Sequence, residues 1–317
     1  MTLAETVATA HAPLIALGVT KIFRERDWLG RLSSNQALSD LDLHLEPGEA
    51  FGLIGPNGAG KSTTIKLILG LAFPTRGTIQ LNGLPCTDHR ARQGVGYIPE
   101  NPALYDHLTA LETVQSAARM QGMGKDQAAT EAERLLNEVG LSERAKSPLR
   151  SFSKGMSQRV AVAHALAGNP RVIIADEPLS GLDPVWRKRV VDLFMAFRDA
   201  GGTLLLSSHI LADVERLADR VGILYGGRLR EVTTPAELLA REVTSYIVRS
   251  QGAAPPSNGA NEGMNQWSQE VAVENLWGVL FELREQDHQL LEIRPSGAGL
   301  EGALTQLLNR YEVEDGM

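Results

Sequence analysis

One nine-residue stretch constrains the fold of this chain more than any other. Gly55-Pro56-Asn57-Gly58-Ala59-Gly60-Lys61-Ser62-Thr63 fits the phosphate-binding pattern G-x-x-x-x-G-K-[ST]. Residues 50–54 before it predict a buried strand, and residues 64–69 after it predict a buried helix. The glycines allow successive N–H groups to turn inward around a phosphate, and the helix adds its N-terminal dipole. A glycine-rich turn with a stray lysine would not explain this context.

The loop assigns a chemical role to two of its side chains. Lys61 is expected to contact the β- and γ-phosphates of a nucleotide, and the Ser62 hydroxyl is expected to ligate Mg²⁺. The sequence therefore predicts a P-loop NTPase that binds a nucleoside triphosphate.

Strands and helices alternate through most of the chain, which predicts an α/β fold with a P-loop NTPase sheet core. The expected strands are 14–19, 41–45, 77–81, 94–98, 172–175 and 203–206, and the helices 184–197 and 210–218 follow the last two strands. Residues 24–36 are expected to form an exposed loop. The helical patterns of 109–121 and 126–139 predict a helical subdomain inserted at about residues 101–168.

A composition shift predicts a second domain. Residues 250–259 are rich in Pro, Gly and Ser, so a linker is expected at about 250–266. Strands at 244–249 and 289–293 and helices at 273–285 and 300–311 predict a small α+β domain. The expected domains are thus 1–243 and 244–317, and the second contains no motif with an evident chemistry.

Composition excludes several classes of protein. The formal charge of −7 argues against a nucleic-acid coat or a polybasic membrane binder. One cysteine, Cys86, excludes an internal disulfide and a cysteine-built metal site. No stretch approaches the ~18 apolar residues of a membrane span, and residues 1–13 do not fit a signal peptide. We therefore expect no direct membrane span, and any action at a membrane through a partner.

Two carboxylates end the apolar strand at 172–175. Asp176 is expected to hold Mg²⁺, and Glu177 is expected to act as general base toward the attacking water. An acidic pair at a strand end is common and would carry little weight alone. Its combination with the P-loop favours the catalytic interpretation.

Three further segments reveal a family resemblance. Ser151–Arg159 precedes the strand of Asp176, Ser180–Asp183 follows it, and His209 follows the next strand. In this order the segments resemble the ATP-binding subunit of an ABC transporter over about residues 14–235. The family signature reads Leu-Ser-Gly-Gly-Gln, from which Phe152, Lys154 and Met156 depart.

The resemblance implies roles for these segments. Ser153 and Gly155 would face the γ-phosphate, Asp183 of the D-loop would contact the nucleotide, and His209 would act catalytically at the γ-phosphate. Without its position in the chain, the signature could equally be a Ser-capped helix. His209 alone could be a structural or surface histidine.

Two positions fit the family pattern less closely. Glu100 ends Tyr97-Ile98-Pro99-Glu100, where the family usually has the glutamine of its Q-loop. Its carboxylate could ligate Mg²⁺ or order the water, but it adds negative charge near a triphosphate. Phe23 falls roughly where the family has an aromatic that stacks on adenine, and a core phenylalanine is the alternative.

The resemblance also implies a mechanism. Two copies, or one copy and a related ATP-binding subunit, would meet head to tail, with ATP between the P-loop of one and the Ser153–Gly155 signature of the other. Closure would drive a separate transmembrane permease from the cytoplasmic face of the cell membrane. The form of the signature and the C-terminal appendix resemble bacterial exporter-type (ABC-2-like) ATPases.

Two other classes of function compete with this interpretation. A soluble ABC-type ATPase acting on nucleic acid or ribosomes usually has two ATP sites in one chain or a long coiled coil, and this sequence has neither. A small-molecule kinase would leave the signature, the D-loop and His209 unexplained.

Overall fold

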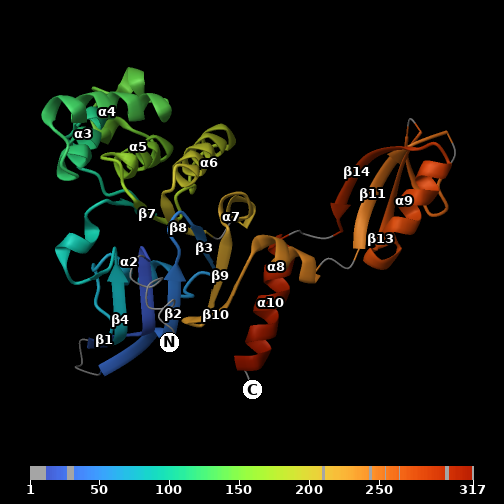
Figure 1. Cartoon of the computed structure of the whole chain (residues 1–317), viewed down its shortest axis with the longest axis horizontal. Helices are drawn as coiled ribbons and strands as arrows, with labels where there is room; N and C mark the ends of the chain where they lie inside the picture. The colour runs from blue at the N-terminus through green and yellow to red at the C-terminus, as the bar shows by residue number, and fades with distance from the viewer. Residues whose placement is uncertain are drawn as a thin grey trace. The chain divides into compact units, whose positions relative to one another are not determined.

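The computed structural model describes residues 12–26, 32–208, 211–242, 245–253, 255–263, 265–296 and 300–315. The chain forms two compact units that divide between Thr234 and Pro235 (Figure 1). The sequence suggested a division after residue 243 instead.

The first unit is built around a six-stranded sheet that carries the P-loop. Five strands are parallel and β10 is antiparallel at one edge, in the order β10-β9-β3-β8-β7-β6. The strands are β3 (Ala50–Ile54), β6 (Val95–Ile98), β7 (Val172–Asp176), β8 (Thr203–Ser208), β9 (Arg220–Tyr225) and β10 (Arg228–Thr233). Every residue of β3, β7 and β8 is buried, which explains their apolar composition. The predicted α/β core is confirmed.

A second, antiparallel sheet corrects one expectation. It has the order β2-β1-β4-β5, with β1 (Leu14–Arg26), β2 (Leu32–Leu45), β4 (Arg76–Leu81) and β5 (Leu84–Pro85). Residues 24–26 and 32–36, expected in an exposed loop, pair across a long hairpin as far as Arg26 opposite Leu32. Polar residues at this exposed end hide the strand pattern from sequence reasoning. Residues 27–31 lie outside the described part of the chain.

Helix α2 (Lys61–Ile68), which follows the P-loop, packs into one apolar cluster with strands of both sheets. Phe51 and Leu53 of β3, Ile65 and Ile68 of α2 and Leu81 of β4 are each completely buried. Burial of one such side chain contributes about 1.5–3 kcal/mol to folding. The P-loop is therefore anchored to the core at both of its ends.

The predicted helical block lies between β6 and β7 in the chain. It contains α3 (Ala110–Met120), α4 (Lys125–Glu138) and α5 (Lys154–Leu166), which lie together in Figure 1, and the short turns η2 (Ser142–Arg144) and η3 (Leu149–Ser151). The turn η1 (His89–Arg92) precedes β6. Thr109 and Glu112 form a capping box that fixes the start of α3.

Two contacts connect this block to α6 (Pro184–Asp199), the helix after β7. Arg189 forms an ion pair with Glu138 of α4 at 3.0 Å. The guanidinium of Arg159 on α5 lies 4.0 Å from the centre of the Trp186 ring. Helix α7 (Leu211–Leu217) follows β8.

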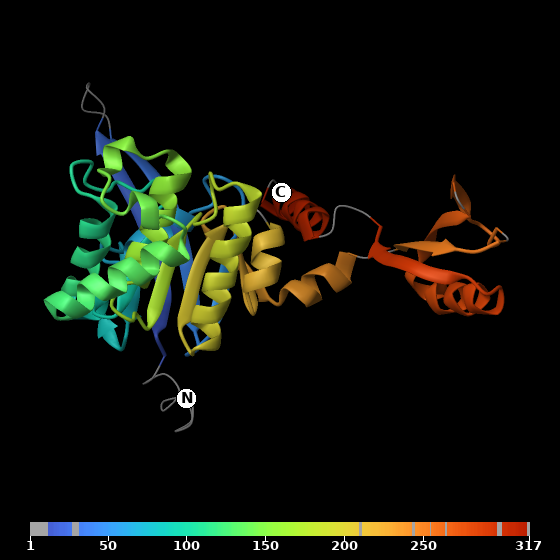
Figure 2. The same ribbon diagram turned by 90° about the horizontal axis from the view of Figure 1, so that it is seen from above.

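The second unit has its own sheet, in the order β12-β13-β11-β14. Its elements are α8 (Pro235–Glu242), β11 (Ser245–Gln251), β12 (Ala260–Gly263), β13 (Gln266–Ala272), η4 (Val273–Asn275), α9 (Leu276–Glu285), β14 (Gln289–Pro295) and α10 (Leu300–Asp315). Helix α9 lies along one face of the sheet (Figure 2), where Leu283 packs with Val248 and Val271. Helix α10 packs against α8.

The second unit also corrects the expected linker at 250–266. That range includes the end of β11, all of β12 and the start of β13, so much of it belongs to the sheet. Pro255, Pro256 and Gly259 serve the turn between β11 and β12. Among the described residues, no helix combines the length and the apolar character needed to cross a bilayer.

Candidate functional site

The P-loop connects β3 to α2 and depends on glycine at two positions. Gly55 has φ 154° and Gly60 has φ 111°, in the region that favours glycine. A Cβ at Gly55 would lie 2.1 Å from the Leu224 carbonyl oxygen, and one at Gly60 would lie 2.8 Å from the Ala37 carbonyl oxygen. Gly60 also caps α2 without a side-chain hydrogen bond. The N-terminal amides of α2 therefore receive no side-chain cap from Gly60, as a phosphate site requires.

A cavity of about 730 Å³ opens over this loop. Predicted residues from four separate segments line it: Phe23, Asn57–Thr63, Glu100 and Glu177. Asn35, Gln36, Ala37, Ser180, Gly226 and Gly227 also line it and were not predicted. Phe23 is 39% exposed, so the alternative of a buried core phenylalanine is wrong.

Lys61 is nearly buried at the floor of this cavity. Its Nζ donates to the carbonyl oxygen of Gly55 at 2.7 Å and to that of Pro56 at 3.1 Å. Burial lowers the pKa of Lys61, and the charges of Glu177, Asp176 and Glu100 act in the opposite direction. The phosphates of a nucleotide would likewise favour the charged form of the ammonium.

Ser207, a residue that the sequence did not single out, contacts the carboxylate of Asp176 and the backbone of Glu177. Asp176 and Ser207 are paired in register on β7 and β8, and the Ser207 hydroxyl donates to Asp176 Oδ1 at 2.6 Å. The same hydroxyl oxygen accepts from the backbone N–H of Glu177 at 3.0 Å. Ser207 therefore holds the metal-ligand candidate and the base candidate in fixed relation. The only sequence signal is a serine ending an apolar strand.

Glu177 has a positive φ of 51°. A non-glycine residue in this region costs of order 1–3 kcal/mol, and such strain clusters at functional sites. The contacts of its N–H with Ser207 help to hold this conformation. Glu177 thus lines the nucleotide cavity from a strained position directly after a buried strand.

Comparisons with known proteins identify the family. The ABC transporter family model matches residues 38–180. An ABC transporter ATP-binding protein of Synechocystis is 39% identical over 236 residues, which are 74% of this chain and 66% of that protein. Nod factor export ATP-binding protein I of Cupriavidus metallidurans is 34% identical over 74% of this chain and 78% of its own length. This chain belongs to the ATP-binding proteins of ABC transporters.

A solved ABC cassette agrees with the fold. It is a dimeric ATP-binding cassette in a post-hydrolysis state, bound to ADP and Pi. It superposes with a TM-score of 0.64 at 26% identity and covers 70% of this chain and 98% of its own. The chain is accordingly an ABC ATPase, an enzyme that hydrolyses ATP.

The ABC signature lies at the start of α5 and does not contribute to the lining of the P-loop cavity. Ser153 caps α5 and accepts from the Met156 N–H at 3.3 Å. A Cβ on Gly155 would approach the Gly181 carbonyl oxygen to 3.1 Å, so the signature packs against the D-loop. Asp183 caps α6 by accepting from the N–H groups of Val185 and Trp186. Neither Ser153, Gly155 nor Asp183 lines the cavity of its own chain.

The donor set suits Mg²⁺. The Ser62 hydroxyl and Glu100 line the cavity, and Asp176 is 4% exposed beside it. Among the described residues no cluster of three or more His, Cys, Asp or Glu could hold a metal. Mg²⁺ needs no such cluster, because it commonly uses one or two protein oxygens together with phosphates and water. His209 lies outside the described residues.

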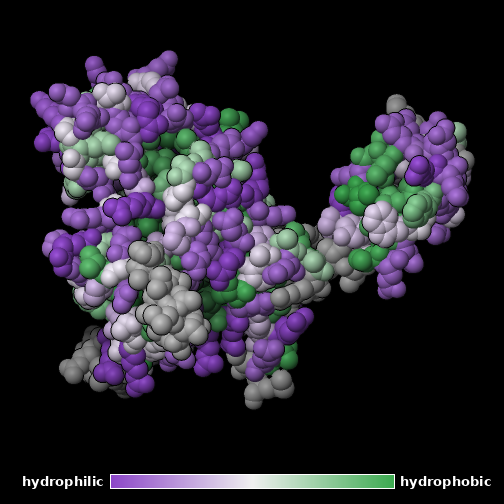
Figure 3. Space-filling view, in the orientation of Figure 1, coloured by the Kyte–Doolittle hydropathy of each residue, from purple (hydrophilic) through white to green (hydrophobic). Residues whose placement is uncertain are grey.

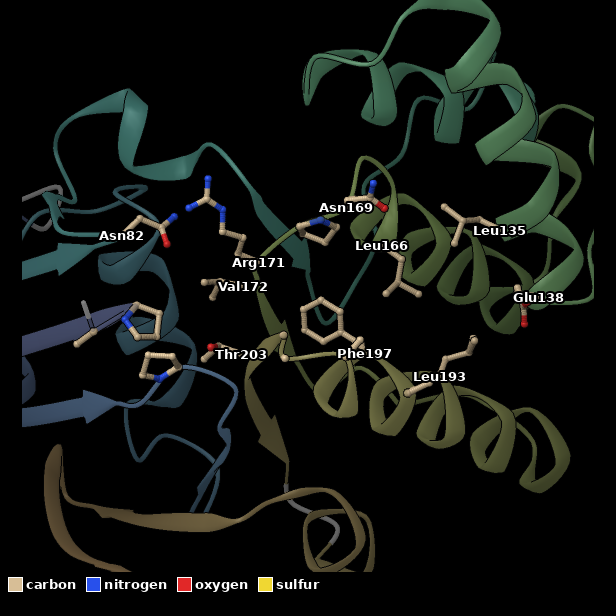
Figure 4. A pocket seen from close by; sticks show the side chains of 18 of the residues that line it. Asn82, Leu135, Glu138, Leu166, Asn169, Arg171, Val172, Leu193, Phe197 and Thr203 are labelled. Carbon is tan, nitrogen blue, oxygen red and sulfur yellow. The ribbon is translucent and has the colours of Figure 1, made fainter. Parts of the chain in front are cut away.

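Another cavity, of about 770 Å³, lies at the amino ends of β7 and β8. Figure 4 shows Arg171 directed toward Asn82 on one side, with Leu166, Leu193 and Phe197 on the other. It contains none of the predicted site residues. In parallel α/β sheets, ligands bind at the carboxyl ends of strands, which favours the P-loop cavity as the site.

Replacing Ser207 with alanine tests its position between the two carboxylates. We expect the free energy of unfolding to fall by about 1–3 kcal/mol, because buried Asp176 loses a donor. We also expect a higher Mg²⁺ concentration for half-maximal ATPase activity. Denaturant unfolding and a Mg²⁺ titration measure the two effects, with exposed Ser116→Ala on α3 as control. A destabilised variant with unchanged Mg²⁺ dependence would restrict Ser207 to a structural role.

Proposed function

We propose that this chain is the ATP-hydrolysing motor subunit of an ABC exporter. One observation carries the proposal: the P-loop cavity and the Ser153–Gly155 signature are both present in the chain, but the signature residues do not line that cavity. A head-to-tail pair of subunits would complete each site with the signature of the partner. The dimeric cassette with ADP and Pi supports this arrangement.

Each residue of the cavity has its own proposed role in the binding or hydrolysis of ATP. Lys61 and the amides at the start of α2 bind the phosphates, while Ser62 and Asp176 would hold Mg²⁺, with Glu100 as a further candidate. When bound, Mg²⁺ would supply positive charge that offsets the charge of the phosphates. Glu177 orients the attacking water and accepts its proton. Phe23 stacks on the base, and His209 is proposed to contact the γ-phosphate.

ATP binding favours the closed pair because the triphosphate contacts both subunits, and hydrolysis removes that difference in affinity. The partner is proposed to be a transmembrane permease, which places the chain at the cytoplasmic face of the membrane. Export agrees with the name of the Nod factor export relative. No observation favours the alternative of action on nucleic acid or ribosomes.

A largely apolar groove provides a docking site for the permease. It has a volume of about 780 Å³ and lies between the segment after β6 and helices α3 and α5. Tyr105 and Met120 line it and are 72% and 75% exposed, respectively. His164 lies at its inner side, where burial lowers the pKa of the imidazole and favours the neutral form. An apolar cytoplasmic helix of a permease matches this lining.

Glutamate substitutions in the groove test the proposal. Tyr105→Glu and Met120→Glu should each weaken binding to the detergent-solubilised permease about tenfold or more, because a charge would enter an apolar interface. The ATPase activity of the isolated chain should not change. Leu71→Glu, at a 65% exposed site outside the groove, is the matched control. Failure of the unsubstituted chain to bind any permease would contradict the proposed function.

A further inference from the structure

Helix α9 has an apolar face that the described residues of the second unit leave uncovered. Its inner side packs on the sheet through Leu283. On its outer side Trp277 is 71% exposed and Phe281 is 61% exposed, and Val273 precedes them. Trp277 and Phe281 are four residues apart on α9 and therefore lie on one stripe, while Val273 belongs to the turn η4 before it. Figure 3 shows hydrophobic residues on the surface of this unit. Aromatic side chains so exposed are typical anchors of protein interfaces.

Gly278 leaves a gap in the same face. Glycine inside a helix costs about 0.5–1 kcal/mol relative to alanine. A Cβ at this position would meet no atom within 4 Å, so packing in the described part of the chain does not require glycine. On α9 its neighbours at i+3, i+4 and i+7 are Phe281, Glu282 and Glu285, and Glu274 stands four residues before it in the turn η4. The gap is therefore bordered by one aromatic ring and by carboxylates, of which that of Glu282 accepts from Ser257.

The charges at this gap are available to a partner. Glu274 and Glu285 are exposed, and neither forms an ion pair with a described residue, whereas Glu282 on the same helix accepts from Ser257. Arg284 places one cation at the C-terminal end of the face. Residues 235–317 contain thirteen acidic and five basic residues, while residues 1–234 contain 25 and 26. The excess negative charge of the chain thus resides in the second unit.

We infer that the outer face of α9 binds a basic, amphipathic segment of the permease. A lysine or arginine of that segment would enter the gap at Gly278 beside the carboxylates that border it, and its apolar residues would cover Trp277 and Phe281. Cytoplasmic segments of membrane proteins carry an excess of Lys and Arg, which supplies the complementary charge. The identity of the partner rests on the proposed function, whereas the chemistry of the surface does not.

Other occupants fit the charge less well. A second copy of this unit would bring together two surfaces of the same net charge, and anionic lipid would meet the same repulsion. Pairing through β14, the edge strand of the sheet, is disfavoured because Glu292, Arg294 and Pro295 lie on it.

Peptide binding to the full chain tests the surface without a permease. The probe is a synthetic 18-residue amphipathic helix of leucine and lysine, and a helix of leucine and glutamate is its counterpart. We expect binding of the lysine peptide only. Trp277→Ser and Phe281→Ser should each weaken it about tenfold or more. Val313→Ser and Glu312→Gln, at exposed sites on α10, are the controls and should leave it unchanged.

Gly278→Gln separates a binding role from a structural one. Glutamine is the better helix former, so the melting temperature should stay the same or rise, while the filled gap should weaken peptide binding about tenfold. Equal binding of both peptides, or α9 variants that bind as the unsubstituted chain does, would overturn the inference. If ATPase activity in the same samples is normal, that result would contradict the inference about α9 and leave the proposed function intact.

A photo-crosslinking residue at position 277 identifies the occupant in cells. The expected product joins α9 to a Lys- or Arg-rich cytoplasmic segment of an integral membrane protein. Crosslinks to a second copy of this chain, to residues 1–234 or to lipid would overturn the inference.

Discussion

Glu177→Gln is expected to lower ATP turnover by about 10²–10⁴-fold while ATP binding survives. Glutamine keeps the size of the side chain but cannot accept a proton from water. The backbone position should persist, because Ser207 contacts the N–H of residue 177 rather than its side chain. Single-turnover hydrolysis and nucleotide binding measured on the same protein check the two parts. The variant should also accumulate as an ATP-bound dimer.

Glu100→Gln is the matched control, since Glu100 lines the same cavity and the family usually has glutamine there. Its ATPase activity should persist. Near-normal hydrolysis in the Glu177 variant would remove that residue from the role of general base. A loss of equal size in both variants would indicate a general effect of charge in the cavity.

Mixing two inactive variants is expected to restore ATP-dependent activity. Lys61→Ala removes the ammonium from the P-loop, and Ser153→Arg blocks the signature face at the start of α5. Each variant alone damages both sites of a homodimer. In a mixed dimer one site collects both lesions, while the other pairs an intact Lys61 with an intact Ser153. Sites built within single chains would each keep one lesion, so rescue supports assembly across subunits.

The measurement is ATP binding and hydrolysis in a mixture shown to contain mixed dimers. Binding is the decisive readout, because two intact sites could be needed for turnover. Absence of tight ATP binding in such a mixture would contradict assembly across subunits. Ser116→Ala in place of Ser153→Arg is the control for the mixing procedure.

The parts of the fold that the sequence predicts are those with a strong local pattern. The P-loop has fixed residue types because Gly55 and Gly60 have no room for a side chain, and Asp176 follows a fully apolar strand. Ser207 has no such pattern, since its role comes from the register between β7 and β8. The register between two strands that are distant in the sequence cannot be deduced from the residues of either strand alone.

The remaining differences have the same origin. Exposed strands such as β12 and the outer part of β2 contain polar residues that resemble loops, so only their pairing reveals them. Strands β9 and β10 were also missed, because the apolar run of β9 is short and contains Gly222, and Arg228, Arg230 and Glu231 leave β10 with few apolar residues. Phe23 could be placed in the cavity only when the hairpin that carries it was defined.

The buried side chain of Gln158 links the signature helix α5 directly to the backbone that follows Glu177. Its Nε2 donates to the carbonyl oxygen of Pro178 at 2.9 Å, immediately after Glu177 in the chain. A displacement of α5 as a rigid rod would therefore pull on the backbone that positions the base. If the permease displaces the helical block, this hydrogen bond would transmit the movement to the backbone beside Glu177. The rate at which water attacks the γ-phosphate would then depend on the force on the helices. A transporter subunit with this linkage would hydrolyse ATP slowly when idle and faster when its cargo moves.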